Sequence, residues 1–322
     1  MKAAVYYETG PPDVFRIEER PEPSCLPDGV VIDVKAISIE GGDVLNRAGG
    51  EMAGSPHIVG YQCAGAVREA GADVSDRTVG QDVVAVMPHG SHASSVSVAA
   101  AQTWPVPEGL ELQQAACVPI PFGTADDCLF EFGRLEAGQT VLIQAGAGGV
   151  GLAAIQLAKR AGATVLATAS SDERLERLRE FGLDHGINYR TADFVTEARK
   201  ITGGKGVDLV VDTVGGKTLQ QSIECLAYRG RVITVGQAGR DAHVPDVGSL
   251  SSGNKTLTGV SLAVELFAQP DRVRPMIERH LAGIAAGALR VVIDRTFPLA
   301  EAAAAHAYIE SRQAFGRVLL LP

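Results

Sequence analysis

The stretch Gly146-Ala147-Gly148-Gly149-Val150-Gly151 has residue types and a spacing that suit phosphate chemistry. It reads G-x-G-x-x-G, and it lies between an apolar run at 140–145 and a segment with helical periodicity at 150–161. In such a turn one glycine bends the chain, one lets the backbone approach a diphosphate, and one lets the helix lie close to the strand. The helix N-terminus then offers N–H groups and a partial positive charge to the phosphates. The alternative is a purely structural glycine turn, but the position between strand and helix favours dinucleotide binding.

Residues after the next predicted strand, 164–169, bear on which dinucleotide would bind. An NAD site usually has an acid at the end of this strand, where it binds the ribose 2′-OH. Here the strand ends in Ser170-Ser171, which leaves room for a 2′-phosphate, and Arg174 on the next helix can pair with that phosphate. Tyr189 could cover the adenine ribose. Asp172 could instead bind the ribose hydroxyl, and Arg174 could be an ordinary surface residue, but the missing acid and the nearby arginine together favour NADPH.

The residues before position 122 predict a mostly-β region. Short runs that alternate between apolar and polar residues are separated there by Gly, Pro and Asp. Pro119 and Pro121 interrupt an apolar run, and we expect a helix to begin just after them, at about Thr124. The expected strands are 3–7, 30–36, 65–69 and 82–86.

From residue 122 the pattern changes to strands that alternate with helices. Continuous apolar runs are typical of strands buried on both faces, and their alternation with helices predicts βαβ units in a parallel sheet. The expected elements are strand 140–145, helix 150–161, strand 164–169, helix 173–181, strand 207–212, strand 231–235, helices 270–287 and 300–311, and a last strand 316–321.

Length, charge and cysteine content limit the classes of function. With 322 residues the chain is too long for one ordinary core, so two domains are expected. A formal net charge of −9 and a pI near 5.3 argue against nucleic acid or an anionic membrane as the main partner. No apolar run is long enough for a membrane span, and the first residues show no signal peptide. Five cysteines without a C-x-x-C pair favour reduced thiols in a cytoplasmic protein.

The glycine turn and its flanks resemble the medium-chain dehydrogenase/reductase superfamily, and within it the zinc-free quinone oxidoreductase, or zeta-crystallin, branch. The resemblance extends over nearly the whole chain and rests on the order and spacing of several pieces. These pieces are 1–7, 56–60, 64–67, 79–84, 115–124, 140–151, 207–216 and Phe315-Gly316-Arg317-Val318.

This resemblance implies an α/β fold with two domains. A Rossmann domain with a doubly wound parallel sheet would occupy 122–261, and a mostly-β, GroES-like catalytic domain would combine 1–121 with 262–322. The cofactor would lie in the cleft between the domains. A homodimer would form through the edge strand of the Rossmann sheet.

The resemblance also implies which residues contact an NADPH cofactor. Thr124 matches a position near the nicotinamide, and Val214 and the stretch 235–238 match segments that line the ribose and nicotinamide. Arg174 stands where lysine is common in the family. The full expected set is Thr124, Gly146, Ala147, Gly148, Gly149, Val150, Ser170, Ser171, Arg174, Tyr189, Val214, Gly236, Gln237 and Arg317.

The positions that hold zinc in related enzymes are changed in this chain. Zinc-dependent relatives carry Cys three residues before Asp, and later Gly-His-Glu. This chain has Glu40 before Asp43, and Gly60-Tyr61-Gln62. Because zinc needs three or four converging N, S or O ligands, we expect no metal to be bound. His89 and His92 have the spacing of a metal-binding pair, but in a loop they are expected to be exposed to solvent.

Hydride transfer to a conjugated carbonyl suits a site without zinc. Oxidation of simple alcohols needs a metal to polarise the oxygen, whereas a developing enolate oxygen needs only hydrogen-bond donors. Glu40, where many relatives have Asn, could accept hydrogen bonds from the cofactor ribose, act as a buried acid with a raised pKa, or point to solvent. Tyr61 could bind the substrate carbonyl or pack in the core. The tyrosine that often follows Arg-x-Gly in the family is absent after Arg47-Ala48-Gly49, so the proton donor stays open.

Three functions are compatible with these residues. The preferred one is a zinc-independent, NADPH-dependent oxidoreductase that reduces quinones or α,β-unsaturated carbonyls. The second is an enoyl reductase or tailoring enzyme that acts on a polyketide-like or carrier-bound substrate. The third is a protein that binds NADPH without turnover.

Overall fold

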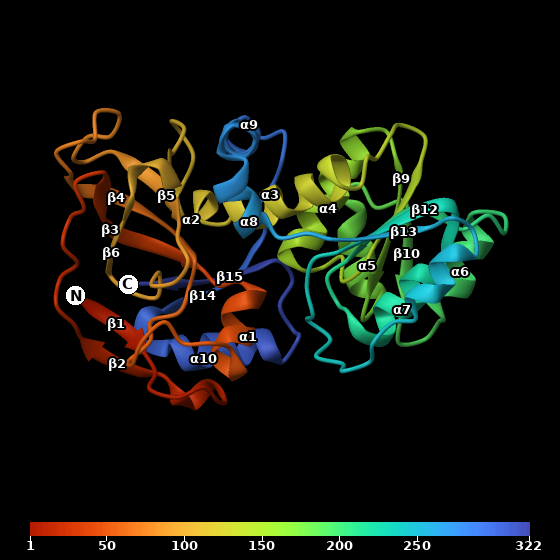
Figure 1. Ribbon diagram of the computed structural model, residues 1–322, viewed down its shortest axis with the longest axis horizontal. Helices are drawn as coiled ribbons and strands as arrows, with labels where there is room; N and C mark the ends of the chain where they lie inside the picture. Colours follow the sequence, from red (N-terminus) through yellow and green to blue (C-terminus); the bar gives the residue numbers. More distant parts are fainter. The chain divides into compact units, whose positions relative to one another are not determined.

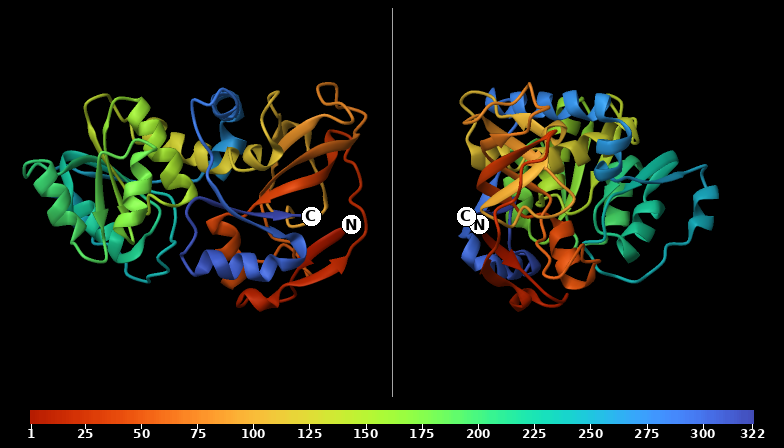
Figure 2. Two further views of the ribbon diagram at one scale, coloured as in Figure 1. Left: turned by 180° about the vertical axis from the view of Figure 1, so that it is seen from behind. Right: turned by 60° about the vertical axis from the view of Figure 1, so that its left-hand side comes forward.

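The computed structural model describes every residue from Met1 to Pro322 and divides the chain into two compact units. Unit 1 comprises 1–120 and 274–322, and unit 2 comprises 121–273. The sequence predicts domain boundaries after residues 121 and 261. In the structure the second boundary lies further along the chain, after residue 273 and inside helix α9 (Pro270–Ala285). The first and last segments of the chain both belong to unit 1, where the two termini lie near each other (Figures 1 and 2).

Unit 1 is built on a seven-stranded sheet. Its strands, in order, are β14 (Ile293–Pro298), β15 (Arg317–Leu321), β3 (Gly29–Ser38), β4 (Gln62–Ala70), β5 (Asp82–Val86) and β7 (Thr103–Pro105), and β6 (Ser95–Ala99) also pairs with β3. All neighbours are antiparallel except β14 and β15. Because β15 pairs with the end of β3, the last strand of the chain lies beside the segment that leads into Glu40.

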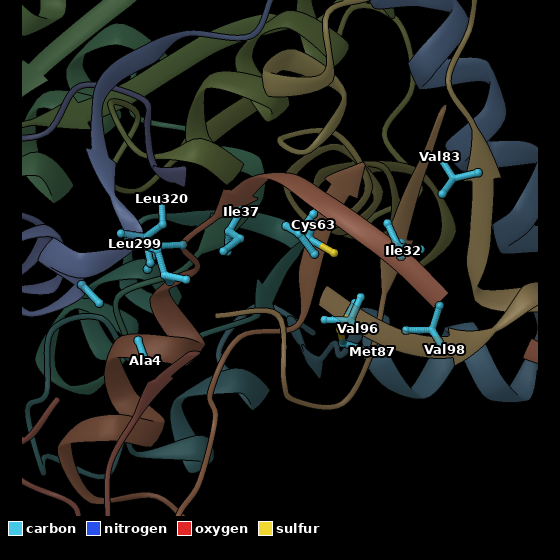
Figure 3. Packing of buried hydrophobic residues seen from close by; sticks show 14 of the residues in the cluster. Ala4, Ile32, Ile37, Cys63, Val83, Met87, Val96, Val98, Leu299 and Leu320 are labelled. Atoms are coloured by element: carbon cyan, nitrogen blue, oxygen red, sulfur yellow. The ribbon is translucent and has the colours of Figure 1, made fainter. Parts of the chain in front are cut away.

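The core of unit 1 is formed by apolar side chains from both faces of long strands. Eight of the ten residues of β3 are buried, as expected of a central strand, and only Asp33 and Lys35 carry appreciable exposed surface. Figure 3 shows this packing, in which β3 contributes Ile32 and Ile37, β4 contributes Cys63, and the C-terminal part contributes Leu299 and Leu320. Each buried aliphatic side chain of this size contributes about 1.5–3 kcal/mol.

Smaller elements surround the unit 1 sheet. They are the strand pair β1 (Lys2–Val5) and β2 (Arg16–Glu19) and the helices α1 (Gly41–Gly49), α2 (Leu112–Ala115) and α10 (Ala302–Glu310). Helix α1 begins directly after Glu40, which is its N-cap residue, and Asp43 lies in its first turn.

Unit 2 contains a six-stranded, fully parallel sheet. Its strands, in order, are β10 (His185–Asn188), β9 (Thr164–Ala169), β8 (Thr140–Ile143), β11 (Val207–Asp212), β12 (Leu226–Thr234) and β13 (Thr256–Gly259). The order reverses between β8 and β11, as in a doubly wound Rossmann sheet, where ligands bind at the carboxyl ends of the strands. The predicted α/β fold class is therefore confirmed.

Helices lie on both faces of this sheet (Figures 1 and 2). They are α4 (Gly149–Arg160), α5 (Asp172–Arg179), α6 (Phe194–Ile201) and α7 (Gly216–Glu224). Helix α8 (Leu262–Ala268) follows the last strand of the sheet along the chain. Helices α6 and α7 share one apolar cluster with the sheet, to which they contribute Phe194, Leu219 and Ile223. In α5, Asp172 lies in the first turn and Arg177 in the last, which complements the helix dipole.

One helix begins earlier than predicted. Helix α3 spans Pro119–Asp126, so it begins at Pro119 and not near Thr124. Both prolines fall in the first turn, where backbone N–H groups have no acceptor within the helix, and a proline there costs little. None of the helices combines the length and apolarity needed to cross a bilayer.

Candidate functional site

The turn 145–151 lies between β8 and α4 and is shaped by close backbone packing. A Cβ on Gly151 would lie 2.5 Å from the carbonyl oxygen of Ala145, and one on Gly146 would lie 2.9 Å from the Cβ of Ala167. Gly148 differs, because it is exposed and a Cβ there would meet only the Ala145 oxygen, at 3.4 Å. Packing therefore requires glycine at 146 and 151, whereas Gly148 leaves open space at the N-terminus of α4, where first-turn N–H groups have no intrahelical acceptor.

The carboxyl ends of β9 and β10 bring the residues expected around a 2′-phosphate into one region. Strand β10 pairs with β9, and the N–H of Tyr189 donates to the carbonyl oxygen of Ala169 at 3.2 Å. Ser171 caps α5, since its Oγ accepts the N–H of Arg174 at 3.3 Å. The hydroxyl hydrogen of Ser171 remains available to donate to another group. Ser170, Ser171 and Arg174 are partly buried.

The loops that follow β11 and β12 are joined by backbone hydrogen bonds. Ala238 N–H donates to the Thr213 oxygen at 3.1 Å, and Gly239 N–H donates to the Val214 oxygen at 2.9 Å. Val214 thus lies beside the segment that contains Gly236 and Gln237, at the same edge of the sheet as the glycine turn. Thr124 is buried in α3 of unit 2.

In unit 1 a cluster of buried polar side chains surrounds Glu40, which is only 3% exposed. Its Oε1 accepts hydrogen bonds from Ser38 Oγ at 3.3 Å, from Gln62 Nε2 and from Arg317 Nη2. Gln62 Oε1 in turn accepts the N–H of Ile120 at 3.1 Å, beside the start of α3. The interpretation of Glu40 as a solvent-facing loop residue is therefore wrong, while its roles as an acceptor from the cofactor ribose and as a buried acid both stay predictions.

Arg317, expected to contact the cofactor, has several partners within unit 1. Its guanidinium forms an ion pair with Glu40, donates to Ser38 Oγ through Nε at 3.1 Å, and donates to the Ile39 carbonyl oxygen at 2.7 Å. These contacts hold β15 against the end of β3. A further contact of Arg317 with the cofactor stays a prediction.

Asp43 and Tyr61 complete the cluster at the first turn of α1. Asp43 is fully buried, its Oδ2 accepts the N–H of Glu40 at 2.8 Å, and its Oδ1 has no hydrogen-bond partner. The Tyr61 hydroxyl lies against Gly42, where an added Cβ would be 2.5 Å from it, and it accepts the backbone N–H of Gly42. The phenol hydrogen of Tyr61 is left to donate elsewhere.

Burial determines the acid–base properties of this cluster. It raises the pKa of Glu40 to about 7, although Arg317 and the hydrogen bonds from Ser38 and Gln62 lower it. It also raises the pKa of Asp43 well above its ordinary value. The pKa of Tyr61 is raised well above 10 by burial and by the negative charges of Asp43 and Glu40, so the phenol stays protonated at physiological pH.

One of the two loop histidines, His92, does not behave as predicted. His89 is exposed, but His92 is fully buried, and its Nε2 lies 3.1 Å from Nε2 of His306 on α10. Backbone hydrogen bonds draw His92 inward, since its N–H donates to Val59 and its oxygen accepts from Ala4. No group of three His, Cys, Asp or Glu side chains is arranged to hold a metal ion, and the absence of zinc stays a prediction.

Two members of the unit 1 cluster were not singled out from the sequence as site residues. Gln62 and Asp43 occupy positions that the zinc motif marks, but the residue types alone do not show that both are buried beside Glu40. The signal that could have identified them is their place in the motif, next to Tyr61 and Glu40.

Both parts of the chain match known protein families. Residues 26–108 match the family described as alcohol dehydrogenase GroES-like domain, and residues 149–280 match the family described as zinc-binding dehydrogenase. The 2-haloacrylate reductase of a Burkholderia species is 36% identical over 336 residues, which cover 100% of this chain and 99% of that protein. A highly-reducing polyketide synthase of Aureobasidium melanogenum is 33% identical over 306 residues, 94% of this chain but 14% of the synthase.

Solved structures with the same fold are also similar along the whole chain. The quinone oxidoreductase of Pseudomonas syringae pv. Tomato DC3000 has a TM-score of 0.94 at 27% identity and covers 100% of this chain and 99% of its own. The Escherichia coli quinone oxidoreductase complexed with NADPH has a TM-score of 0.94 at 27% identity, with both chains fully covered.

Proposed function

The chain belongs to the medium-chain dehydrogenase/reductase superfamily, in its zinc-free quinone oxidoreductase branch, and on that premise we propose that it is an NADPH-dependent reductase of quinones or α,β-unsaturated carbonyl compounds. It is an oxidoreductase of that superfamily, and the proposal concerns its cofactor, its substrate class and its independence of zinc. When bound, NADPH supplies the hydride. The protein contributes binding, orientation and hydrogen-bond donors.

The observation that carries the proposal is the arrangement at the carboxyl edge of the unit 2 sheet. The open space at Gly148 fits a diphosphate, which the N-terminus of α4 would hold through N–H groups of Gly149 and Val150. At the neighbouring strand end, the Ser171 hydroxyl hydrogen and the Arg174 guanidinium are suited to a 2′-phosphate. Quinone oxidoreductases with this fold include one solved with NADPH, which supports the same cofactor here.

In unit 1 we assign Tyr61 the role of hydrogen-bond donor to the substrate carbonyl oxygen. Its oxygen already accepts the Gly42 N–H, so its hydrogen is the one it can offer, and its raised pKa keeps that hydrogen in place. A donor directed at the oxygen that gains negative charge lowers the barrier to hydride addition. Glu40 and Asp43, both buried, act on Tyr61 through their charge and by holding the first turn of α1.

The test is consumption of NADPH, followed by its absorbance, with a simple benzoquinone and with 2-cyclohexenone. Turnover of either substrate supports the proposal, and Arg174→Ala should raise the Kd for NADPH about tenfold or more, because it removes a charge-assisted hydrogen bond of about 1.5–3 kcal/mol. Tight NADPH binding without consumption of any enone, quinone or enoyl thioester would instead favour the third function, a protein that binds NADPH but catalyses no reaction. Stoichiometric zinc in elemental analysis would contradict the metal-free proposal.

A second candidate is supported by the polyketide synthase relatives. Nearly the whole chain is similar to a segment that makes up 14% of such a synthase. We therefore propose an enoyl thioester as the alternative substrate class. A kcat/KM for crotonyl-thioester that exceeds those for quinone and enone by tenfold or more would favour this alternative.

We also propose a homodimer that forms through β13. This strand is the outermost of the parallel sheet, with β12 as its one neighbour, so its other edge can pair with a second copy. Light scattering behind size-exclusion chromatography should give twice the chain mass, and a monomeric mass would contradict the proposal.

A further inference from the structure

A chain of buried polar side chains crosses the carboxyl edge of the unit 2 sheet. Its members are Thr168 near the end of β9, Gln144 directly after β8, Asp212 at the end of β11 and Ser222 in α7. Each of the four is at most 2% exposed. Because β9, β8 and β11 are neighbours, this chain connects three adjacent strands at the edge where the glycine turn lies. We call these four residues the relay.

The hydrogen bonds of the relay all point in one direction. The N–H of Ala145 donates to Thr168 Oγ1 at 3.2 Å, and this hydroxyl donates to Gln144 Oε1 at 2.7 Å. Gln144 Nε2 donates to Ser222 Oγ at 3.2 Å, and this hydroxyl donates to Asp212 Oδ2 at 2.8 Å. Each hydroxyl and the amide thus both donates and accepts, so every link of the relay depends on its neighbour.

At one end, the Asp212 carboxylate organises the loop 213–216 after β11. Its Oδ1 accepts the N–H groups of Val214 and Gly215, each at 2.8 Å. Gly215 and Gly216 both have positive φ, 75° and 58°, a conformation that the two amide contacts help to fix. With the Ser222 hydroxyl on the other oxygen, the side chain of Asp212 accepts three hydrogen bonds.

At the other end of the relay, Thr168 binds the backbone of the first two residues of the glycine turn. Ala145 has a φ of 53°, a left-handed conformation that non-glycine residues rarely adopt. Its N–H is bound by Thr168 Oγ1, and the next N–H, of Gly146, donates to the Thr168 carbonyl oxygen at 2.9 Å. Thr168 therefore fixes the backbone of both residues that begin the turn 145–151.

We propose that the relay is a positioning device that holds the turn 145–151 and the loop 213–216 in one mutual geometry suited to a dinucleotide. The inference rests on the proposed function, since these two segments are those assigned to the diphosphate and the ribose. The relay residues act through the backbone they hold. A binding backbone that is already ordered loses less conformational freedom when the ligand binds, and this strengthens binding.

Two substitutions break the relay at separate links. Thr168→Val keeps the side-chain shape and removes the hydroxyl, and Ser222→Ala removes the donor to Asp212. Each should raise the Kd for NADPH about tenfold, measured by fluorescence titration, because each leaves buried groups without partners. Thr168→Ser, which retains the hydroxyl, should restore the affinity to within about threefold of the native value.

The double variant Thr168→Val/Ser222→Ala distinguishes a relay from two local effects. The two residues are linked through Gln144. If they act through one relay, the double variant should bind about as weakly as either single variant. Independent effects would multiply to about a hundredfold. Should Ser222→Ala not fold, Gln144→Met breaks the same link and takes its place.

A control separates positioning from general stability. Val210→Ala truncates a buried side chain of β11 in the apolar cluster and should lower Tm at least as much as the relay variants, with a Kd within twofold of the native value. If the relay variants lower Tm but leave Kd within twofold, or if their effects multiply in the double variant, the relay proposal is overturned. Failure of the native protein to bind NADPH or NADH would instead overturn the proposed function, and the relay proposal with it.

Discussion

Asn188, the last residue of β10, donates a hydrogen bond from Nδ2 to Oδ1 of Asp172, the first residue of α5, at 3.0 Å. Asp172 is the first acidic residue after β9 along the chain, and from the sequence alone it could bind the ribose 2′-OH. Because Asn188 engages one of its oxygens, the carboxylate is held toward β10. This contact favours a 2′-phosphate over a 2′-hydroxyl at Ser170 and Arg174.

The first prediction follows from this contact. Asn188→Leu should release Asp172, which then repels a 2′-phosphate and can accept from a ribose hydroxyl. We expect the ratio of kcat/KM for NADPH to that for NADH to fall about tenfold, roughly 1.4 kcal/mol. The control is Asn188→Leu/Asp172→Ala, in which the ratio should recover. A ratio that stays low in this double variant would show that Asn188 acts in some other way.

The second prediction concerns Tyr61. Tyr61→Phe removes the phenol hydrogen assigned to the substrate carbonyl and preserves the ring. Loss of such a donor costs about 10²–10³ in kcat, while the Kd for NADPH should change little and Tm should fall only slightly, because Gly42 N–H loses its acceptor. Steady-state kinetics, with fluorescence titration and thermal unfolding as controls, measure the three quantities. A fall in kcat of less than about threefold would remove Tyr61 from the mechanism.

The third prediction concerns pH. The pKa of Glu40, raised by burial to about 7, means that this carboxyl loses its proton as the pH rises through neutrality. The new negative charge raises the pKa of Tyr61 further and weakens the phenol as a donor. We therefore expect kcat to decline as the pH rises through about 7, and Glu40→Gln, which cannot ionise, to flatten this decline. Identical pH profiles for the native protein and Glu40→Gln would contradict the assignment.

The stability of the native protein should show the same titration. A carboxyl whose pKa is raised in the folded state stabilises the fold below its unfolded value of 4.5, and this contribution is lost as the pH rises to about 7. Compared with Glu40→Gln, the native protein should lose stability over this range by up to about 1.4 kcal/mol per pH unit, measured by urea unfolding.

The unit 2 fold could be predicted from the sequence because its determinants are local. The continuous apolar runs at 164–169 and 207–212 coincide with β9 and β11, and the glycine turn lies where strand gives way to helix. The start of α3 could not be placed correctly, because proline interrupts a helix except in its first turn, and only the folded chain shows that Pro119 lies there.

The surroundings of Glu40 could not be deduced from the sequence. Its ion-pair partner Arg317 lies 277 residues further along the chain, and the pairing of β15 with β3 brings them together. Spacing within the motif at 40–43 gives no information about such a contact. The same holds for the relay, in which Gln144 and Ser222 are 78 residues apart.

His92 illustrates the same limit and leads to the last prediction. A histidine in a loop was expected to be exposed, but a distant helix places His306 against it, and Phe15 stacks on its ring. Burial lowers the pKa of His92 to about 3, and burial, His92 and Arg47 lower the pKa of His306 well below 6.5. Both rings are therefore neutral in the folded protein, and the Nε2 of one donates to the Nε2 of the other.

Acid should consequently destabilise unit 1 through this pair. As the pH falls below 6.5, the unfolded chain takes up protons on both histidines, whereas the folded protein keeps His92 neutral down to about pH 3 and His306 neutral well below pH 6.5. The free energy of unfolding therefore falls as the pH falls. His92→Gln keeps a donor and an acceptor near the position of Nε2 but does not titrate. We expect urea unfolding at pH 7, 6 and 5 to show two differences. At pH 7 the variant should be less stable than the native protein. As the pH falls, its free energy of unfolding should decline less steeply than that of the native protein, and the two slopes should differ by up to about 1.4 kcal/mol per pH unit. Parallel declines in the two proteins would mean that His92 takes up a proton while folded, and that the pair opens without unfolding.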